Sequence, residues 1–323
     1  MTSMTKTSMT KPTERPASAG REGRSKFRLS EKTREALTGY LLILPLFFGV
    51  TILFFYPIAR SIELSFMKTG IFSGETFVGL AQYKRLFSDP QTWVATRNTF
   101  IYALVALFEI PIAVFFATLL HSKNLKFLSG YRVFFFLPVV TLPSAIGMIW
   151  ALMYNGDFGI VNYVSGLFGA PKISWLTTPY VVIIAVAFVG IWMGLGRSII
   201  LILAGLQTVP KELHEAAEID GAGPIRQFFD VTLPMISPTV FLVAVLNVIA
   251  SMQVFDLIFI MINPDTNPIY REAQTLVVYF YEVGFIDSNR GYAAAISIFL
   301  LVIIMAITGL QFWLQRRWVN YDR

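Results

Sequence analysis

The chain has 323 residues, of which 55% are hydrophobic and only 14% are charged, and its mean hydropathy is +0.62. This composition excludes an ordinary soluble domain. The absence of cysteine excludes a disulfide framework, a thiol nucleophile and a thiolate metal site. The net charge of +6 would suit nucleic acid, but most basic residues flank apolar segments. We therefore expect a lipid bilayer, and no nucleic acid, among the partners.

Six stretches reach the length of roughly 20 mostly apolar residues that a membrane-crossing helix needs. They lie at about 37–59, 98–120, 132–154, 180–205, 236–262 and 292–314. Residues 1–36 form a basic leader, which we expect to be cytoplasmic and partly disordered. The first span is too long, and begins too late, for a cleaved signal peptide. The sequence predicts an all-α polytopic membrane protein with a six-helix transmembrane domain over 37–323.

The distribution of Lys and Arg predicts the topology. The leader, the 121–132 and 206–235 loops and the tail together carry 17 of them, whereas the loops at 59–97, 155–179 and 263–291 carry 8. Because basic residues accumulate on the cytoplasmic side, both termini and the loop at 207–235 are predicted to be cytoplasmic.

That loop, between the fourth and fifth spans, predicts two short helices outside the bilayer. Pro210 suits the first position of a helix, and Gly221 can adopt the left-handed conformation that ends one. Gly223 and Pro224 then begin a second helix. One face of the first helix is shallow and carries Leu213, Ala216, Ala217 and Asp220. An amphipathic helix lying on the membrane is the alternative, but the loop has few cations for anionic lipid.

Three short motifs in this loop resemble the EAA signature of the permease subunits of binding-protein-dependent ABC importers. They are Glu215-Ala216-Ala217, Asp220-Gly221-Ala222 and Val231-Thr232-Leu233-Pro234. The resemblance extends over roughly residues 40–321 and is closest to the carbohydrate-uptake type, in particular the maltose-type first permease. Residues 263–268 depart from it, since Asn-Pro-Asp-Thr-Asn-Pro stands where such permeases often have Gly-Gly-Pro.

The resemblance implies a type I ABC importer permease fold and the import of a sugar or oligosaccharide. It also implies three kinds of partner protein: a second homologous permease, two ATP-binding subunits and an extracytoplasmic solute-binding protein. The implied location is the inner or plasma membrane of a bacterium or archaeon. The residues that it assigns to coupling with the ATPase are Glu215, Ala216, Ala217, Asp220, Gly221 and Ala222. The chain has no G-x-x-x-x-G-K-[ST] motif, so we expect no enzymatic activity and no cofactor in it, with ATP and Mg on the partner ATPase.

Two alternatives remain for the function. The same machinery could import glycerol-3-phosphate or another polyol-type solute. A secondary transporter would need no ATPase, but it predicts inverted repeats with broken helices, and the sequence shows none. A membrane enzyme or metal site is disfavoured, because the two histidines, His121 and His214, both lie near the predicted cytoplasmic surface.

The fifth span contains candidate residues of the solute pathway. Asn247 and Ser251 are four residues apart and therefore share a helix face. Their polar groups suit a hydroxyl-rich solute, whereas the alternative role is hydrogen bonding between helices. In the maltose-type relatives this part of the helix contacts the sugar, which also implicates Gln253. Trp192 and Gly194 of the fourth span are candidates for a stacking surface and the space beside it.

Three ionisable residues fall within predicted spans, where each costs about 2.5–3.5 kcal/mol on insertion scales. For Glu109 we favour a pairing or capping role within the bundle over a role in transport. For Asp256 a role in a gate and a role in a structural pair are equally supported. Arg197 shares a helix face with Gly194. It either contacts the solute, or pairs with an acid such as Glu109 or extends to the inner interface.

Overall fold

The computed structural model describes residues 31–70, 74–121 and 128–319, and the chain divides into two units, 1–56 and 57–323. Most of the leader predicted over 1–36 therefore lies outside the described residues. The first unit contains α1 (Glu31–Val50) and a π-helical turn (Thr51–Phe55), and α2 (Tyr56–Leu64) follows. The segment Glu31–Leu64 contains the first predicted span and is long and apolar enough to cross a membrane.

Three further predicted spans coincide with long apolar helices of the second unit. α4 (Pro90–Ala106) and α5 (Glu109–His121) together form one, α9 (Val181–Leu206) the next and α17 (Arg290–Gln315) the last. α4 begins before the predicted residue 98. Asp89 caps it by accepting a hydrogen bond from the Gln91 N–H, and Pro90 occupies its first turn.

The span predicted at 132–154 is not one continuous helix. α6 (Leu128–Val140) and α7 (Pro143–Met153) are separate helices. The chain bends by 116° between Val133–Val140 and α7. Leu142 has an extended backbone, with φ −63° and ψ 130°. The ring of a proline disfavours the helical conformation of the residue before it, so Pro143 ends one helix and begins the next.

The span predicted at 236–262 is also interrupted. α13 (Ser237–Met252) stops at Gln253, and α14 (Asp256–Met261) begins three residues later. At its other end, α13 makes an angle of 69° with the segment Pro224–Met235. In the part of the chain that the structure describes, four helices are long enough to span a membrane, or up to six if each bent pair is one span. The count of six spans stays a prediction.

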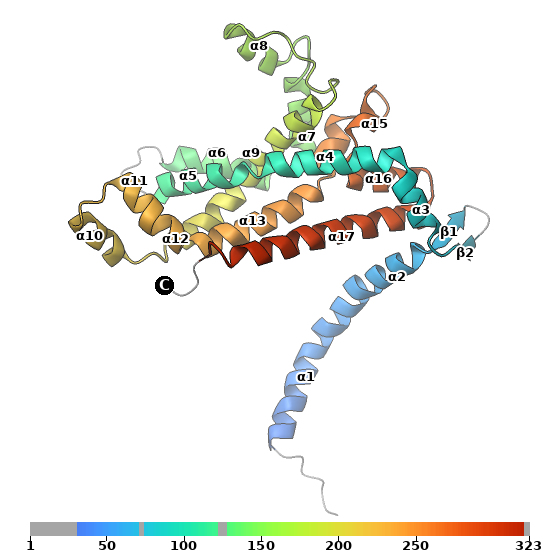
Figure 1. Ribbon diagram of the computed structural model, residues 1–323, viewed down its shortest axis with the longest axis horizontal. Helices are drawn as coiled ribbons and strands as arrows, with labels where there is room; N and C mark the ends of the chain where they lie inside the picture. Colours follow the sequence, from blue (N-terminus) through green and yellow to red (C-terminus); the bar gives the residue numbers. More distant parts are fainter. Residues whose placement is uncertain (1–30, 71–73, 122–127, 320–323) are drawn as a thin grey trace, which may run out of the picture. The chain divides into compact units, whose positions relative to one another are not determined.

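α9 forms the centre of the second unit. It packs against α4, α5, α6, α13 and α14. Figure 1 shows α4 with α5, α13 and α17 running alongside one another through the unit. Most of the buried side chains of α9 are apolar, and Ile183, Ile199 and Ile202 are fully buried.

Two predicted outer loops meet at one end of this bundle. They contribute α3 (Ala81–Ser88), α15 (Tyr270–Ala273), α16 (Leu276–Tyr281) and a π-helical turn (Glu282–Ile286). Asp89 Oδ2 accepts hydrogen bonds from Tyr279 at 2.5 Å and Tyr292 at 2.7 Å, which ties the two loops together. The first loop also contains an antiparallel pair, β1 (Met67–Gly70) and β2 (Gly74–Phe77), a small departure from the all-α prediction.

The predicted coupling loop lies at the other end. It contains α10 (Lys211–Ile219), α11 (Pro224–Gln227), a π-helical turn (Phe228–Thr232) and α12 (Leu233–Met235). The Phe241 ring near the start of α13 contacts the rings of Phe312 and Trp318 at the end of α17. The loop and the end of α17 therefore lie at the same end of the bundle (Figure 1). The predicted topology requires this arrangement, although which side of the membrane they face stays a prediction.

The remaining helix of the described residues, α8 (Ile160–Leu167), follows α7.

Candidate functional site

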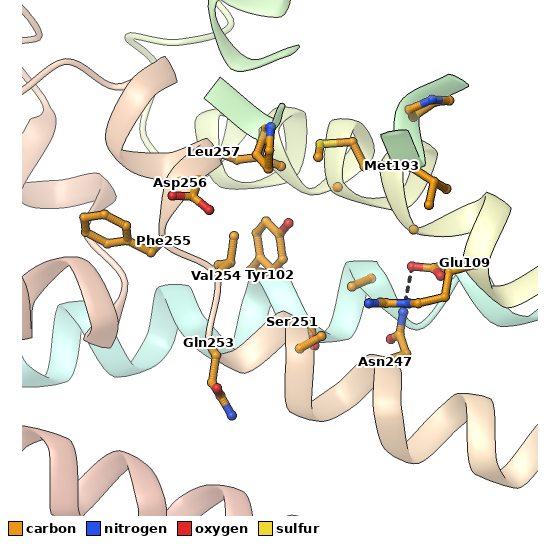
Figure 2. A pocket seen from close by; sticks show the side chains of 18 of the residues that line it. Tyr102, Glu109, Met193, Asn247, Ser251, Gln253, Val254, Phe255, Asp256 and Leu257 are labelled. Carbon is orange, nitrogen blue, oxygen red and sulfur yellow. Dashed lines mark hydrogen bonds between the residues drawn. The ribbon is translucent and has the colours of Figure 1, made fainter. Parts of the chain in front are cut away.

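A cavity of about 450 Å³ opens between the helices of the second unit. Its walls come from α4, α5, α9 and α13, from the two helix breaks, and from the start of α14. Figure 2 shows the labelled side chains around it. Irregular backbone is tolerated at membrane depth only where it is buried in protein or lines a water-filled space. Both breaks meet that condition, since Thr141 and Val254 line the cavity.

The carboxyl group of Glu109 joins three helices at the wall of this cavity. Glu109 on α5 is only 3% exposed. Its Oε1 accepts a hydrogen bond from Ser198 Oγ on α9 at 2.5 Å, and its Oε2 accepts one from Asn247 Nδ2 on α13 at 2.7 Å. Figure 2 shows Glu109 and Asn247 pointing toward one another. The prediction of a pairing role within the bundle agrees with this arrangement.

Gly194 on α9 provides the space for that carboxyl group. A Cβ atom built on Gly194 would lie 2.3 Å from Glu109 Oε2 and 2.6 Å from its Cδ, far inside van der Waals contact. Only a residue without a side chain therefore permits this approach of Glu109 to the backbone of α9.

Arg197 lies one turn further along α9 and also lines the cavity. Its side chain is exposed, and among the described residues it makes neither a hydrogen bond nor an ion pair within 4.0 Å. The ion pair with Glu109 that we considered from the sequence is therefore not formed in this structure. Asp256, at the start of α14, is a second exposed charged residue in the cavity wall.

Five of the six residues predicted for the solute pathway line this one cavity: Gly194, Arg197, Asn247, Ser251 and Gln253. Trp192 does not, because its ring packs against Trp150, with the ring centroids 5.8 Å apart. Tyr102 lines the cavity and was missed. Its position seven residues before Glu109, and so on the same face of a regular helix, was the available signal.

The turn between α10 and α11 has the predicted conformation. Gly221 has φ +75°, the Gly221 N–H donates to the Glu218 carbonyl, and the Ala222 N–H donates to the Ala217 carbonyl. These two bonds make a Schellman motif, the common glycine-terminated end of a helix.

The six predicted coupling residues all lie on α10 or in this turn. Glu215, Ala216, Asp220 and Gly221 are exposed, and Ala217 and Ala222 are half-buried. Three large apolar side chains of the loop are exposed beside them, Leu213 at 40%, Ile219 at 87% and Ile225 at 77%. An exposed apolar surface around a rigid turn is the kind of surface that another protein covers. Nowhere in the described part of the chain, this loop included, do three acidic or histidine side chains gather closely enough to hold a metal ion.

The sequence of the chain matches a known protein family. The family described as "Binding-protein-dependent transport system inner membrane component" matches residues 109–320, which include the Glu109 contacts, the loop and all the lining residues of the cavity except Tyr102 and Ala106. The chain belongs to this family. It is thus a multi-pass membrane permease of the ABC importer type, as the EAA motifs predicted.

Permeases with assigned solutes resemble the chain over most of its length. The arabinooligosaccharides transport system permease protein AraP of Halalkalibacterium halodurans is 34% identical, over 88% of this chain and 89% of its own. The trehalose/maltose permease protein MalF of Thermococcus litoralis is 32% identical, over 86% and 93%. The sn-glycerol-3-phosphate permease protein UgpA of Agrobacterium fabrum is 31% identical, over 87% and 96%.

The fold also has a counterpart among solved structures. A chain of a bacterial alginate ABC transporter, crystallised with an alginate pentasaccharide-bound periplasmic protein, matches with a TM-score of 0.77. The match covers 90% of this permease and 98% of that chain at 22% identity. It supports the ABC permease fold.

Proposed function

We propose that this permease is one of two homologous membrane subunits of an ATP-driven importer of sugars or oligosaccharides. The other components are two ATP-binding subunits and an extracytoplasmic solute-binding protein, assembled in the inner or plasma membrane of a bacterium or archaeon. The family membership and the assigned solutes of the relatives support this proposal. Catalysis of ATP hydrolysis belongs to the partner subunits, so this chain carries no catalytic residue or cofactor.

The observation that carries the proposal is the cavity between α4, α5, α9 and α13. Hydrogen-bonding groups on several helices face one space, which is what a solute with many hydroxyl groups requires. Asn247, Ser251 and Gln253 supply both donors and acceptors there. Because the walls include two helix breaks, small rotations of the flanking helices would open the cavity to one side of the membrane or the other.

The α10–α11 hairpin is the proposed contact with the ATPase. Its Schellman turn holds α10 at a fixed angle to α11, and the chain continues without an irregular loop through α12 toward α13. Movement imposed on α10 is thereby transmitted to α13, which lines the cavity. This mechanical link would convert closure of the ATPases into alternating access.

A second candidate solute is a glycerol-3-phosphate-like anion. Arg197 favours it, since a guanidinium without an ion-pair partner in the described structure, placed in a cavity wall, suits a phosphate or carboxylate. The relative UgpA carries such a solute by name. Asp256 in the same wall acts against an anion, and a neutral sugar remains the first candidate.

Purification of the tagged chain from its native membrane tests the proposal. We expect an ATPase and a second permease to co-purify and to hydrolyse ATP faster when the loaded binding protein is added. A chain that transports alone, without an ATPase, would contradict it. Mass spectrometry of the solute held by the purified binding protein then decides between a sugar and an anionic polyol.

A further inference from the structure

The turn between α10 and α11 contains a side-chain hydrogen bond in addition to the two bonds of its Schellman motif. The Nε2 atom of Gln227 donates to the carbonyl oxygen of Ala222 at 2.8 Å. Gln227 is half-buried, whereas the other residues of α11, Pro224, Ile225 and Arg226, are exposed. The side chain of Gln227 is therefore turned back onto the turn.

This bond spans the part of the turn that the main-chain bonds leave free. The Schellman motif ends at the Ala222 N–H, and the Gln227 N–H donates to the Gly223 carbonyl at 2.9 Å to begin α11. The Ala222 carbonyl and the backbone of Gly223 lie between these bonds. A Cβ atom on Gly223 would meet nothing within 4 Å, so packing does not restrict this glycine either. The Gln227 side chain thus joins the two sides of the least restricted part of the turn.

Gln227 also connects the turn to the base of the loop. No residue of α10 is buried, and α10 packs against α11 and the following π-helical turn. The carbonyl oxygen of Gln227 accepts a hydrogen bond from Thr232 Oγ1 at 3.4 Å. Thr232 is only 7% exposed, and its own carbonyl oxygen accepts from the N–H of Ile236, directly before α13. Gln227 therefore has bonds both toward α10 and toward the start of α13.

We infer that Gln227 is a positioning residue for coupling, because its side chain stiffens the α10–α11 turn. A displacement of α10 is then passed on to α13 and is not lost as bending of the turn. A glutamine suits this role, since its side chain reaches back across Gly223 and ends in an NH₂ donor for a carbonyl oxygen. The inference rests on the proposed function and specifies how the coupling loop keeps its shape.

Two substitutions of Gln227 remove the donor. Gln227→Leu removes the hydrogen-bonding groups, and Gln227→Glu keeps the shape but places a carboxylate oxygen, which cannot donate, against the Ala222 carbonyl. We expect both variants to assemble and to transport about threefold to tenfold less solute per ATP hydrolysed, the effect of losing one hydrogen bond. Gln207→Leu is the matched control. Gln207 is exposed at the end of α9, and its side chain has no hydrogen bond among the described residues, so the ratio should stay at the wild-type value.

The rescue adds Gly223→Ala to Gln227→Leu. Gly223 has φ −68° and ψ 168°, which alanine also adopts, and the added Cβ atom has open space. Alanine restricts the backbone at this position without replacing the lost bond. We expect the double variant to recover at least about half of the lost ratio of solute to ATP. A direct contact between Gln227 and the ATPase would not be restored in this way.

The stiffness of the turn is measured separately from transport. The chain has no cysteine, so Lys211→Cys and Asp230→Cys, both at exposed positions, allow two spin labels to be attached specifically. The distribution of distances between the labels in the assembled complex reports the orientation of α10 relative to the π-helical turn. We expect a broader distribution in Gln227→Leu than in the wild type, and a narrower one again in the double variant.

The assay uses the complete transporter in proteoliposomes, with maltose, trehalose, arabinotriose and glycerol-3-phosphate as probes. Loss of coupling in both Gln227 variants, with a broader distribution and recovery in the double variant, supports the inference. A wild-type ratio in Gln227→Leu, an equal loss in Gln207→Leu, a loss without broadening, or a folded double variant without recovery would overturn it and leave the proposed function intact. Failure of both Gln227 variants to assemble would also overturn it, since the role would then be structural. Failure of the wild-type complex to transport any probe would instead count against the proposed function, whereas the distance distributions would still show whether Gln227 stiffens the turn.

Discussion

Gly194 faces Glu109 so closely that a Cβ atom on the glycine would lie 2.3 Å from the carboxyl oxygen. Any side chain at this position must displace the carboxyl group, which is bonded to both Ser198 and Asn247. We expect Gly194→Ala to reduce the stability of the complex by about 1–3 kcal/mol, as overpacking of a core does. Transport should fall with it, because the helix contacts around the cavity are lost. The measurement is the melting temperature and uptake of the reconstituted complex.

Gly309→Ala is the matched control for that substitution. Gly309 also lies inside a long apolar helix, α17, but a Cβ atom there meets nothing within 4 Å. Alanine is favoured over glycine in a helix by about 0.5–1 kcal/mol, so this variant should be as stable as the wild type or slightly more stable. Equal behaviour of the two variants would contradict the close contact of Gly194 with Glu109.

Replacement of Gly221 by Leu tests the turn of the coupling loop. The Cβ atom would meet nothing within 4 Å, so the whole penalty comes from the backbone at φ +75°, about 1–2 kcal/mol for a residue with a side chain. We expect the complex to insert and assemble but to hydrolyse ATP with little transport. Gly223→Leu is the control, because that position is equally open and does not have a positive φ. If both variants import at the wild-type rate, the turn has no part in coupling.

Replacement of Glu215 by Lys tests the proposed contact with the ATPase. Glu215 is exposed and forms no ion pair among the described residues, so its charge is available to a partner. A charge-assisted contact of about 1.5–3 kcal/mol would become a repulsion, and we expect ATP hydrolysis to proceed without uptake. Glu215→Gln, which removes the charge without reversing it, should have an intermediate effect. Full uptake by Glu215→Lys, measured as solute per ATP, is the result that would exclude this contact.

The Asp89 carboxylate predicts a pH dependence of stability. Burial raises the pKa of Asp89, but hydrogen bonds from Tyr279, Tyr292 and the Gln91 N–H outweigh it and hold that pKa below its usual value. A carboxyl group with a lowered pKa stabilises the fold above its unfolded pKa of about 3.9 and loses this contribution as the pH falls through the folded pKa. Asp89→Asn should therefore lower the melting temperature at pH 7 and reduce its further decline below about pH 4. A decline as steep as that of the wild type would contradict this assignment.

Arg197→Gln distinguishes the two candidate solutes. Because Arg197 has no ion-pair partner in the described structure, we expect the variant to assemble and to hydrolyse ATP normally. Uptake of glycerol-3-phosphate should fall by about tenfold or more if a charge-assisted bond to the solute is lost, whereas uptake of maltose should change little. Failure of the complex to assemble would show that the arginine has a structural role.

The sequence predicts those parts of the fold that depend on local chemistry. Length and apolarity identify the helices at Pro90–His121, Val181–Leu206 and Arg290–Gln315, and Gly221 identifies the end of α10. Pro143 is a local signal for the bend at Leu142. Because the residues on both sides of the bend are mostly apolar, hydropathy alone indicates one span there and does not reveal the break. The break at Gln253 has no glycine or proline within it, so its cause lies in tertiary packing rather than in local preference.

The candidate site was predictable in composition but not in its connections. Asn247 and Ser251 were identified as polar residues that share one face of an apolar helix, and Gly194 as a possible space beside Trp192. Their relation to Glu109 depends on the register of α5, α9 and α13 against one another, which a single sequence does not specify. The separation of Trp192 from the cavity has the same origin, since a small rotation of α9 decides which of its residues face the space.

Uptake by the reconstituted transporter tests the central claim most directly. The permease pair, the ATPase and the loaded binding protein are assembled in proteoliposomes, with ATP inside and the labelled sugar from the binding protein outside. We predict accumulation of the sugar that requires ATP, the binding protein and the ATPase together, and that is abolished when the ATPase is omitted. Accumulation that continues without the ATPase, driven by an ion gradient alone, would contradict it.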